Sequence, residues 1–334
     1  MKTSAKKLFS LTLVLVMLFA MSATGLTVNA EEKDLGEVWV IVKNETFSTA
    51  DSAPWEGVLI DQKYQLKSDS TMLSVVEDVF KDNNVSYSLN QYSYLSEVNG
   101  LSEYAFNGSG GWMMTLNDWF TSESSSAYTV SNGRLSDGDV ITVQYSCSWG
   151  SDIGSLWGDT NTQLKNITLD GAEFAWAEEF TPSKTEYTIV LNPDNESDKI
   201  GVIPEAFNKN YQVKTYLNQY TPDQPGTEIK ALTKELSVKE GDVIYIGVGN
   251  ENWASMNEKT SETVYKLTVK SHPAKGDVNN DGVLNIKDAT LIQKYLAKST
   301  QFSRLQALTA DVNGDGTVNI SDVTVIQKLI AKAS

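Results

Sequence analysis

The pattern of apolar and polar positions changes along the first half of the chain. The run 37–42 is rich in β-branched and aromatic residues and predicts a strand. In 71–81 the apolar residues fall at positions 72, 73, 75, 76, 79 and 80, which is the spacing of one helix face, and Ser70 or Thr71 lies where a cap is needed. Short strand-like segments separated by turn residues follow at 94–100, 110–117 and 135–145. Residues 37–158 are therefore predicted to form one α+β module, mostly β.

A second β-rich region follows the first. Its short segments of alternating apolar and polar residues lie at 164–171, 180–190, 239–248 and 265–269. Segments of this length and spacing are typical of a β-sandwich, so residues 161–270 are predicted to form a middle module of that kind. We interpret this module as a spacer. The alternative is a ligand face built from its aromatic residues, Trp176, Tyr211, Tyr216, Tyr220 and Trp253.

Helical spacing of apolar residues returns near the C-terminus, at 289–298 and 323–332. A loop rich in Asp and Asn precedes each of these segments. Pro273 and Gly276 indicate that residues 271–276 form a linker. Residues 277–334 are therefore predicted to be a small all-α module with two loops, which makes the whole chain multidomain.

The two loops, 277–288 and 311–322, carry the same pattern of oxygen-bearing side chains. Each has Asp or Asn at loop positions 1, 3, 5, 9 and 12 and glycine at position 6, as EF-hand calcium loops do. Position 7 ligates through its backbone carbonyl, which Val283 and Thr317 can provide. The alternative is a pair of Asn/Asp-rich turns that hold no metal. The pattern predicts two Ca²⁺ ions, held by Asp277, Asn279, Asp281, Val283, Asn285, Asp288, Asp311, Asn313, Asp315, Thr317, Asn319 and Asp322.

The duplicated loop and helix, with Asp rather than Glu at position 12, resembles a type I dockerin. The resemblance implies a partner, the cohesin module of a scaffoldin in a cellulosome-like or amylosome-like complex. It also implies cohesin contacts from both repeats, at Ile286, Lys287, Gln293, Lys294, Lys298, Ile320, Ser321, Gln327, Lys328 and Lys332. Such symmetry resembles dockerins that bind in two orientations, although Lys287 and Ser321 differ. The alternative is that the lysines only form a solvated helix face.

Two further resemblances concern the two β-rich modules, 37–158 and 161–270, which we call the front modules. The order of strand, helix, Val98-Asn99-Gly100, Gly110-Gly111-Trp112-Met113 and Asp137-Gly138-Asp139-Val140-Ile141 resembles the transcobalamin-like C-terminal domain family. That resemblance implies a ligand site of the kind that closes over a corrinoid, but the chain lacks the α-helical partner domain of the cobalamin carriers. The spacing of Phe180, Pro182 and Tyr187 resembles bacterial cadherin-like β-sandwich repeats, which implies a spacer or adhesion module.

Charge and targeting signals narrow the functional classes. Three lysines before an apolar run and the Val28-Asn29-Ala30 site predict a signal peptide at 1–30, and hence a secreted protein. The dockerin resemblance implies that this protein is attached to the cell surface through its scaffold. Beyond it, no apolar run is long enough to span a membrane. The net charge of −16 disfavours nucleic acid and anionic membranes as partners. With Cys147 as the only cysteine, no intramolecular disulfide can form.

Aromatic residues in polar, turn-rich stretches of the first module predict a carbohydrate site, because a flat ring beside amides suits a sugar. The candidates are Tyr92, Trp119 and Trp149. The chain is not predicted to be an enzyme, since its one histidine, His272, lies in the linker and no Gly-x-Ser-x-Gly motif occurs. The expected role is a non-catalytic component that binds starch or plant-wall glycan. The alternatives are a structural or adhesion protein that binds another protein, and small-molecule binding of the corrinoid type.

Overall fold

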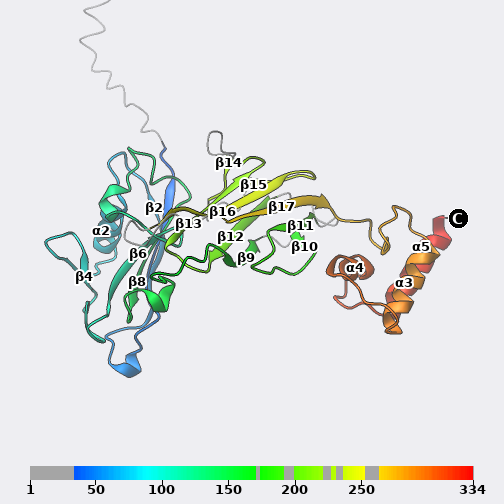
Figure 1. Cartoon of the computed structure of the whole chain (residues 1–334), viewed down its shortest axis with the longest axis horizontal. Coiled ribbons are helices and arrows are strands. Elements are labelled where there is room, and N and C mark those ends of the chain that lie inside the picture. The colour runs from blue at the N-terminus through cyan, green and yellow to red at the C-terminus, as the bar shows by residue number, and fades with distance from the viewer. Residues whose placement is uncertain are drawn as a thin grey trace, which may run out of the picture. The chain divides into compact units, whose positions relative to one another are not determined.

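The computed structural model describes residues 34–170, 174–191, 199–220, 227–230, 236–252 and 263–333. The predicted signal peptide, residues 1–30, lies outside the described residues. Residues from Gly36 onward form one compact unit, and many of its helices and strands are labelled in Figure 1. No helix in the described part of the chain combines the length and apolarity needed to cross a bilayer.

The first module is built around a five-stranded sheet in the order β2-β1-β8-β6-β7. Strand β1 pairs antiparallel with β2 and parallel with β8, and β8 pairs antiparallel with β6. A small sheet of β3, β4 and β5 and the 3-10 turns η1, η2 and η3 complete it. The bounds are β1 Glu37–Asn44, η1 Thr49–Asp51, β2 Gly57–Gln65, β3 Tyr87–Leu89, β4 Leu95–Val98, β5 Leu101–Ser102, β6 Gly111–Leu116, β7 Trp119–Phe120, η2 Ser125–Ala127, β8 Val140–Ser146 and η3 Ser151–Ile153.

The one α-helix of this module, α2 (Met72–Asp82), forms where the sequence predicts it. Thr71 and Ser74 make a reciprocal capping box, which satisfies backbone N–H groups that the first turn leaves unpaired. The apolar face of α2, including Val75 and Phe80, is fully buried. Burial of that face fixes the helix against the module's core.

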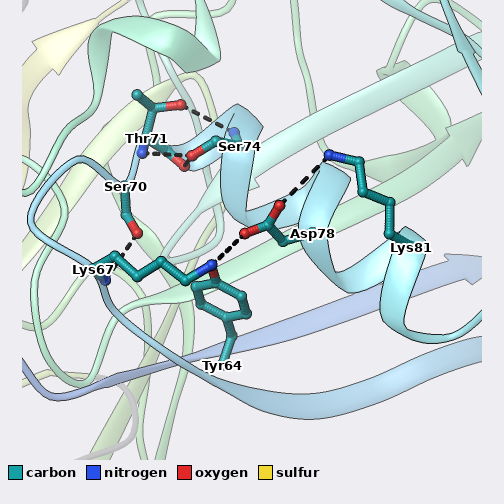
Figure 2. A network of polar contacts seen from close by, with 7 residues as sticks. All are labelled: Tyr64, Lys67, Ser70, Thr71, Ser74, Asp78 and Lys81. Carbon is teal, nitrogen blue, oxygen red and sulfur yellow. Dashed lines mark hydrogen bonds and ion pairs between the residues drawn. The ribbon is translucent and has the colours of Figure 1, made fainter.

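A polar network ties α2 to strand β2 (Figure 2). The carboxylate of Asp78 accepts hydrogen bonds from the Tyr64 hydroxyl and the Lys67 ammonium, both at 2.7 Å. Lys81 lies 3.6 Å from the same carboxylate, one helical turn away. The hydrogen bond from Lys67, followed by that from Tyr64, holds the pKa of Asp78 below its usual value. Asp78 therefore stays ionised at neutral pH, and the network holds the outer side of α2 to β2.

The described residues between 164 and 271 form two sheets that share one core. The six-stranded sheet has the order β10-β11-β17-β16-β13-β14, and the three-stranded sheet has the order β15-β12-β9. Ile167 and Val202 from the smaller sheet pack with Ile246 and Leu267 from the larger one. The bounds are β9 Leu164–Asp170, β10 Phe174–Trp176, β11 Glu186–Leu191, β12 Lys199–Ala206, β13 Tyr211–Leu217, β14 Thr227–Glu228, β15 Leu236–Ser237, β16 Val243–Asn252 and β17 Thr263–Ser271.

The same asparagine-centred turn occurs in both β-rich modules. Asn117 follows β6 with a left-handed φ of 52°, donates from its side-chain amide to Asp139, and accepts from the backbone N–H of Val140. Asn218 follows β13 with φ 65° and makes the same bonds with Asp242 and with the N–H of Val243. Asn tolerates the left-handed region better than most side chains. The Gly-Asp-Val-Ile motif thus starts a strand that is clamped to the end of its neighbour.

The two β-rich modules meet through specific contacts. The Trp119 indole N–H donates to the carbonyl of Asn210 at 3.2 Å, and the Phe120 N–H donates to the carbonyl of Lys209 at 2.9 Å. Lys209 pairs with Asp118 at 2.6 Å, and the Ser155 hydroxyl donates to the Asn210 side chain at 2.9 Å. On the first module these contacts come from β7, from Asp118 just before it and from Ser155 just after η3. The modules are therefore joined by a bonded interface as well as by the connecting chain.

The C-terminal region contains three helices, α3 (Ile286–Leu296), α4 (Arg304–Ala310) and α5 (Ile320–Ala333). Helices α3 and α5 begin three residues before the predicted segments, because Asn285 and Asn319 accept N–H groups of the first helical turn. Helix α4 was not predicted; Ser303 and Gln306 form its capping box. A small core joins the three helices and includes Ile292, Ala310 and Ile326.

Candidate functional site

The first candidate calcium loop, Asp277–Asp288, folds around its own carboxylates. Asp277 accepts the N–H groups of Asp281 and Gly282 at 3.1 and 2.8 Å. Asp288, at loop position 12, accepts the N–H groups of Asn279 and Asn285 at 3.2 and 2.9 Å. Gly282 has φ 80°, a backbone conformation that a side chain would strain. The loop's first and last ligand positions are thereby held in one tight turn.

The second loop, Asp311–Asp322, repeats the arrangement. Asp311 accepts from Asp315 and Gly316 at 3.1 and 2.8 Å. Asp322 accepts from Asn313 and Asn319 at 3.2 and 2.9 Å. Position 6 is again left-handed, with φ 81° at Gly316. Hydrogen bonds from Thr317, its hydroxyl first and its N–H second, lower the pKa of Asp315, which favours the anion that a calcium ligand must be.

The donor set fits calcium. Asp277, Asp288 and Asp322 are 2 %, 0 % and 0 % exposed. Among the described residues their carboxylates accept only backbone N–H groups, and no lysine or arginine pairs with them. Burying a carboxylate without a countercharge is costly. A divalent cation held by these oxygens, the Asn side chains and the carbonyl at position 7 would supply the missing charge.

The predicted cohesin-contact residues lie at the surface of the two repeats. Ile286 and Ile320 are 57 % and 61 % exposed although both are large and apolar. The eight polar positions of the prediction are all exposed as well. Lys298 lies beyond the end of α3, with φ 57°. An exposed isoleucine thus occupies the first position of both α3 and α5.

A second candidate site lies on the first module. We call it the aromatic hollow, a depression of about 290 Å³ lined by Asn90, Tyr94, Glu103, Tyr104, Ser109, Gly110, Gly111, Met113, Ser146 and Trp149. Trp149 is 61 % exposed and Tyr104 is 53 % exposed. A Cβ on Gly111 would lie 2.6 Å from the Tyr94 hydroxyl, so the glycine leaves room for that ring. Burial raises the pKa of Tyr94 to about 12, and its hydroxyl keeps its proton.

The two residues that contribute exposed rings to the aromatic hollow both have rare backbone conformations. Trp149 has φ 52° and Tyr104 has φ 63°, in the region that non-glycine residues seldom adopt. The Trp149 turn is held by Asp152, which accepts from the Ser146 hydroxyl and the Cys147 N–H at 2.5 and 2.7 Å. Strain of this kind persists where the surroundings fix it, often at ligand sites. The fold therefore holds two aromatic rings outward beside one depression.

Of the three predicted ligand aromatics, the structure brings Trp149 to the aromatic hollow and Tyr92 close to it. Tyr92 is 79 % exposed and lines a neighbouring depression of about 280 Å³ that shares Tyr94 and Met113 with the hollow. The prediction for Trp119 is wrong, because this side chain is only 2 % exposed and is held by Asn210. Tyr104 was missed; its signal in the sequence is an aromatic residue shortly before the glycine-rich stretch 108–111.

Comparison with known proteins bears on the C-terminal region. The family model of the dockerin type I domain matches residues 275–331. No curated protein matches the chain. A crystal structure of a candidate metal binding protein from Ruminococcus gnavus ATCC 29149 aligns at 15 % identity over 33 % of this chain and 96 % of that chain, with a TM-score of 0.22, which is too low to indicate a shared fold. The two loops and their helices, residues 275–331, are a type I dockerin domain, a kind of domain that binds calcium.

Proposed function

We propose that this protein is a non-catalytic, extracellular component of a polysaccharide-degrading complex, attached through its dockerin to a cohesin on a scaffold. The observation that carries the proposal is the pair of loops, whose buried carboxylates pair with no lysine or arginine among the described residues. Each loop is followed by a helix that begins with an exposed isoleucine. Two Ca²⁺ ions, one per loop, would fix the two helices in the geometry that the cohesin recognises. The signal peptide predicted at 1–30 supports the extracellular assignment.

The two repeats carry the same residues at four of the five predicted contact positions, with only Lys287 and Ser321 different, which predicts that either repeat can contact the cohesin. Ile286→Asp or Ile320→Asp alone should weaken binding only about twofold, because the other repeat still offers its face. Ile286→Asp with Ile320→Asp should abolish binding, since a carboxylate would be desolvated in either orientation. Surface plasmon resonance of the full chain against a panel of cohesins, in excess calcium, measures this.

Leu308→Asp on α4 is the matched control, since Leu308 is also apolar and exposed at 38 % but lies outside the predicted contact set. It should bind as the unaltered chain does. Unreduced cohesin binding by the double variant would refute the predicted surface. Complete loss in one single variant would show that only that repeat makes the contact.

For the front modules we propose carbohydrate binding at the aromatic hollow. The observation that favours it is the pair of exposed rings, Trp149 and Tyr104, beside the polar side chains of Asn90 and Glu103. The flat rings would take the C–H face of a sugar, and the amide and carboxylate would bond its hydroxyls. Starch and plant-wall glycans are the substrate classes that suit a dockerin-bearing component. The paired sheets of residues 164–271 would act as a rigid spacer.

Trp149→Ala should weaken polysaccharide binding about tenfold, because it removes the most exposed ring of the hollow. Affinity electrophoresis of the full chain through gels containing starch, xylan, glucomannan or soluble cellulose derivatives measures the loss. Phe207→Ala is the matched control, since Phe207 is 44 % exposed but lies outside the hollow. Equal retardation of Trp149→Ala and the unaltered chain would contradict the assignment.

If none of the four gels retards the unaltered chain, the hollow has a different ligand. A protein ligand would then make this an adhesion or structural component. A corrinoid ligand would shift the visible spectrum of cobalamin on mixing, and Trp149→Ala would reduce that shift.

A further inference from the structure

A further hollow lies where the two β-rich modules meet. We call it the intermodule cleft; its volume is about 410 Å³, within the range of small-molecule sites. One side comes from the first module, with Val140 and Thr142 of β8. The other comes from the second, with Ile203 of β12 and Val213 of β13. The cleft does not overlap the aromatic hollow, because the two share no lining residue.

The apolar walls of the cleft are formed by Val140, Val202, Ile203, Pro204, Val213 and Ile229. Asn117, Thr142, Thr168 and Thr215 add uncharged polar groups to its lining. Ile203 remains 40 % exposed although it lies among these side chains. An apolar body that filled the cleft would remove this surface from water, which is favourable through the hydrophobic effect.

Charged groups surround the apolar walls, and all but one are neutralised within the protein. Asp118 pairs with Lys209 at 2.6 Å, and Glu205 pairs with Lys165 at 2.8 Å. Lys230 lies between Asp139 and Glu228, at 2.9 and 3.2 Å. Each lining carboxylate therefore has a lysine partner and cannot serve as a free receptor for a cation.

Lys214 is the exception. Its side chain makes no hydrogen bond or ion pair with any described residue, although it lines the cleft from β13. It also lines an adjoining hollow of about 140 Å³ that contains Lys230 and Arg134. The ammonium group of Lys214 can therefore pair with an anionic ligand. Such an anion would not be repelled by an unpaired carboxylate, because every carboxylate that lines the cleft is paired with a lysine.

We propose that the intermodule cleft binds a small aromatic acid, whose apolar ring lies against Val140, Ile203 and Val213 and whose anionic group pairs with Lys214. The inference goes beyond docking and beyond glycan binding at the aromatic hollow, and it depends on neither. Since both modules contribute walls, the ligand also joins them more tightly.

The probe for the test is anilinonaphthalene sulfonate, an aromatic anion that fluoresces in apolar surroundings. Titration into the full, calcium-loaded chain should show a saturable component. Ile203→Trp should abolish that component, because the larger ring fills the cleft from a half-exposed position that tolerates it. Trp149→Ala should leave it unchanged, which separates this site from the aromatic hollow. A component that survives in Ile203→Trp would overturn the proposal.

The charge is tested with a matched pair of lysines. Lys214→Met should weaken the affinity for the probe about tenfold, as expected for loss of a charged partner. Lys270→Met is the control, because Lys270 is exposed on β17, forms no side-chain ion pair among the described residues and lies outside the cleft. Cinnamate should displace the probe, whereas acetate, which lacks an apolar body, should not. Equal affinity in the two methionine variants, or displacement by acetate alone, would contradict the assigned ligand class.

Discussion

Removal of calcium is expected to unfold the dockerin domain and to leave the two β-rich modules folded. The domain is about 60 residues long, and a core of that size supplies little stability by itself. A ligand that binds only the folded state at about 100 times its dissociation constant adds roughly 2.7 kcal/mol. After chelation, the buried carboxylates of Asp277, Asp288 and Asp322 would also lack any countercharge.

Hydrogen exchange followed by mass spectrometry is the direct measurement, since it reports each region separately. In excess chelator, amides of α3 and α5 should lose their protection, while those of β1, β8 and β16 should keep theirs. Protection that persists in α3 and α5 would show that the loops are stable without metal.

The same result should follow from Asp277→Ala with Asp311→Ala in the presence of calcium, because each change removes the ligand at loop position 1. Asp82→Ala is the control, since Asp82 is an exposed carboxylate at the end of α2. Its exchange pattern should match that of the unaltered chain. If the double variant also keeps cohesin binding, calcium has no part in docking.

The C-terminal region could be predicted in detail because its chemistry is local. A calcium loop places its ligands within twelve consecutive residues, and the bonds from Asp281 and Gly282 to Asp277 follow that order. Helix α2 was predictable for the same reason, since its cap and its apolar face lie within one short segment. Helix α4 is only seven residues long, too short for a periodic signal.

The aromatic site could be predicted only in part, because exposure depends on distant residues. Trp119 and Trp149 both stand next to polar turn residues in the sequence. Trp149 projects outward, whereas Trp119 is covered by a loop about ninety positions later that contains Asn210. Strand β12 was missed because it contains Gly201 and Pro204, which weaken a strand signal. Strand β12 forms nevertheless, because its backbone pairs with that of β9 over most of its length.

Truncation of Trp119 is the substitution expected to destabilise the front modules most. Its ring is 2 % exposed and packs edge-to-face against Tyr128, with centroids 6.0 Å apart. Removal of a buried Trp or Phe side chain typically costs about 3–5 kcal/mol through lost burial and the remaining cavity. Trp119→Ala would also leave the carbonyl of Asn210 without its indole donor.

Because Trp119 lies at the contact between the modules, its loss should affect both of them. Urea unfolding of the calcium-loaded chain should show the free energy of unfolding lowered by about 3 kcal/mol or more. Hydrogen exchange should show faster opening in β13 of the second module as well as in β6 of the first. Trp149→Ala is the control; its side chain is largely exposed, so the change should be within about 0.5 kcal/mol. If Trp119→Ala loosens β6 but leaves β13 protected, the two modules fold independently, and the bonds through Lys209 and Asn210 do not couple them.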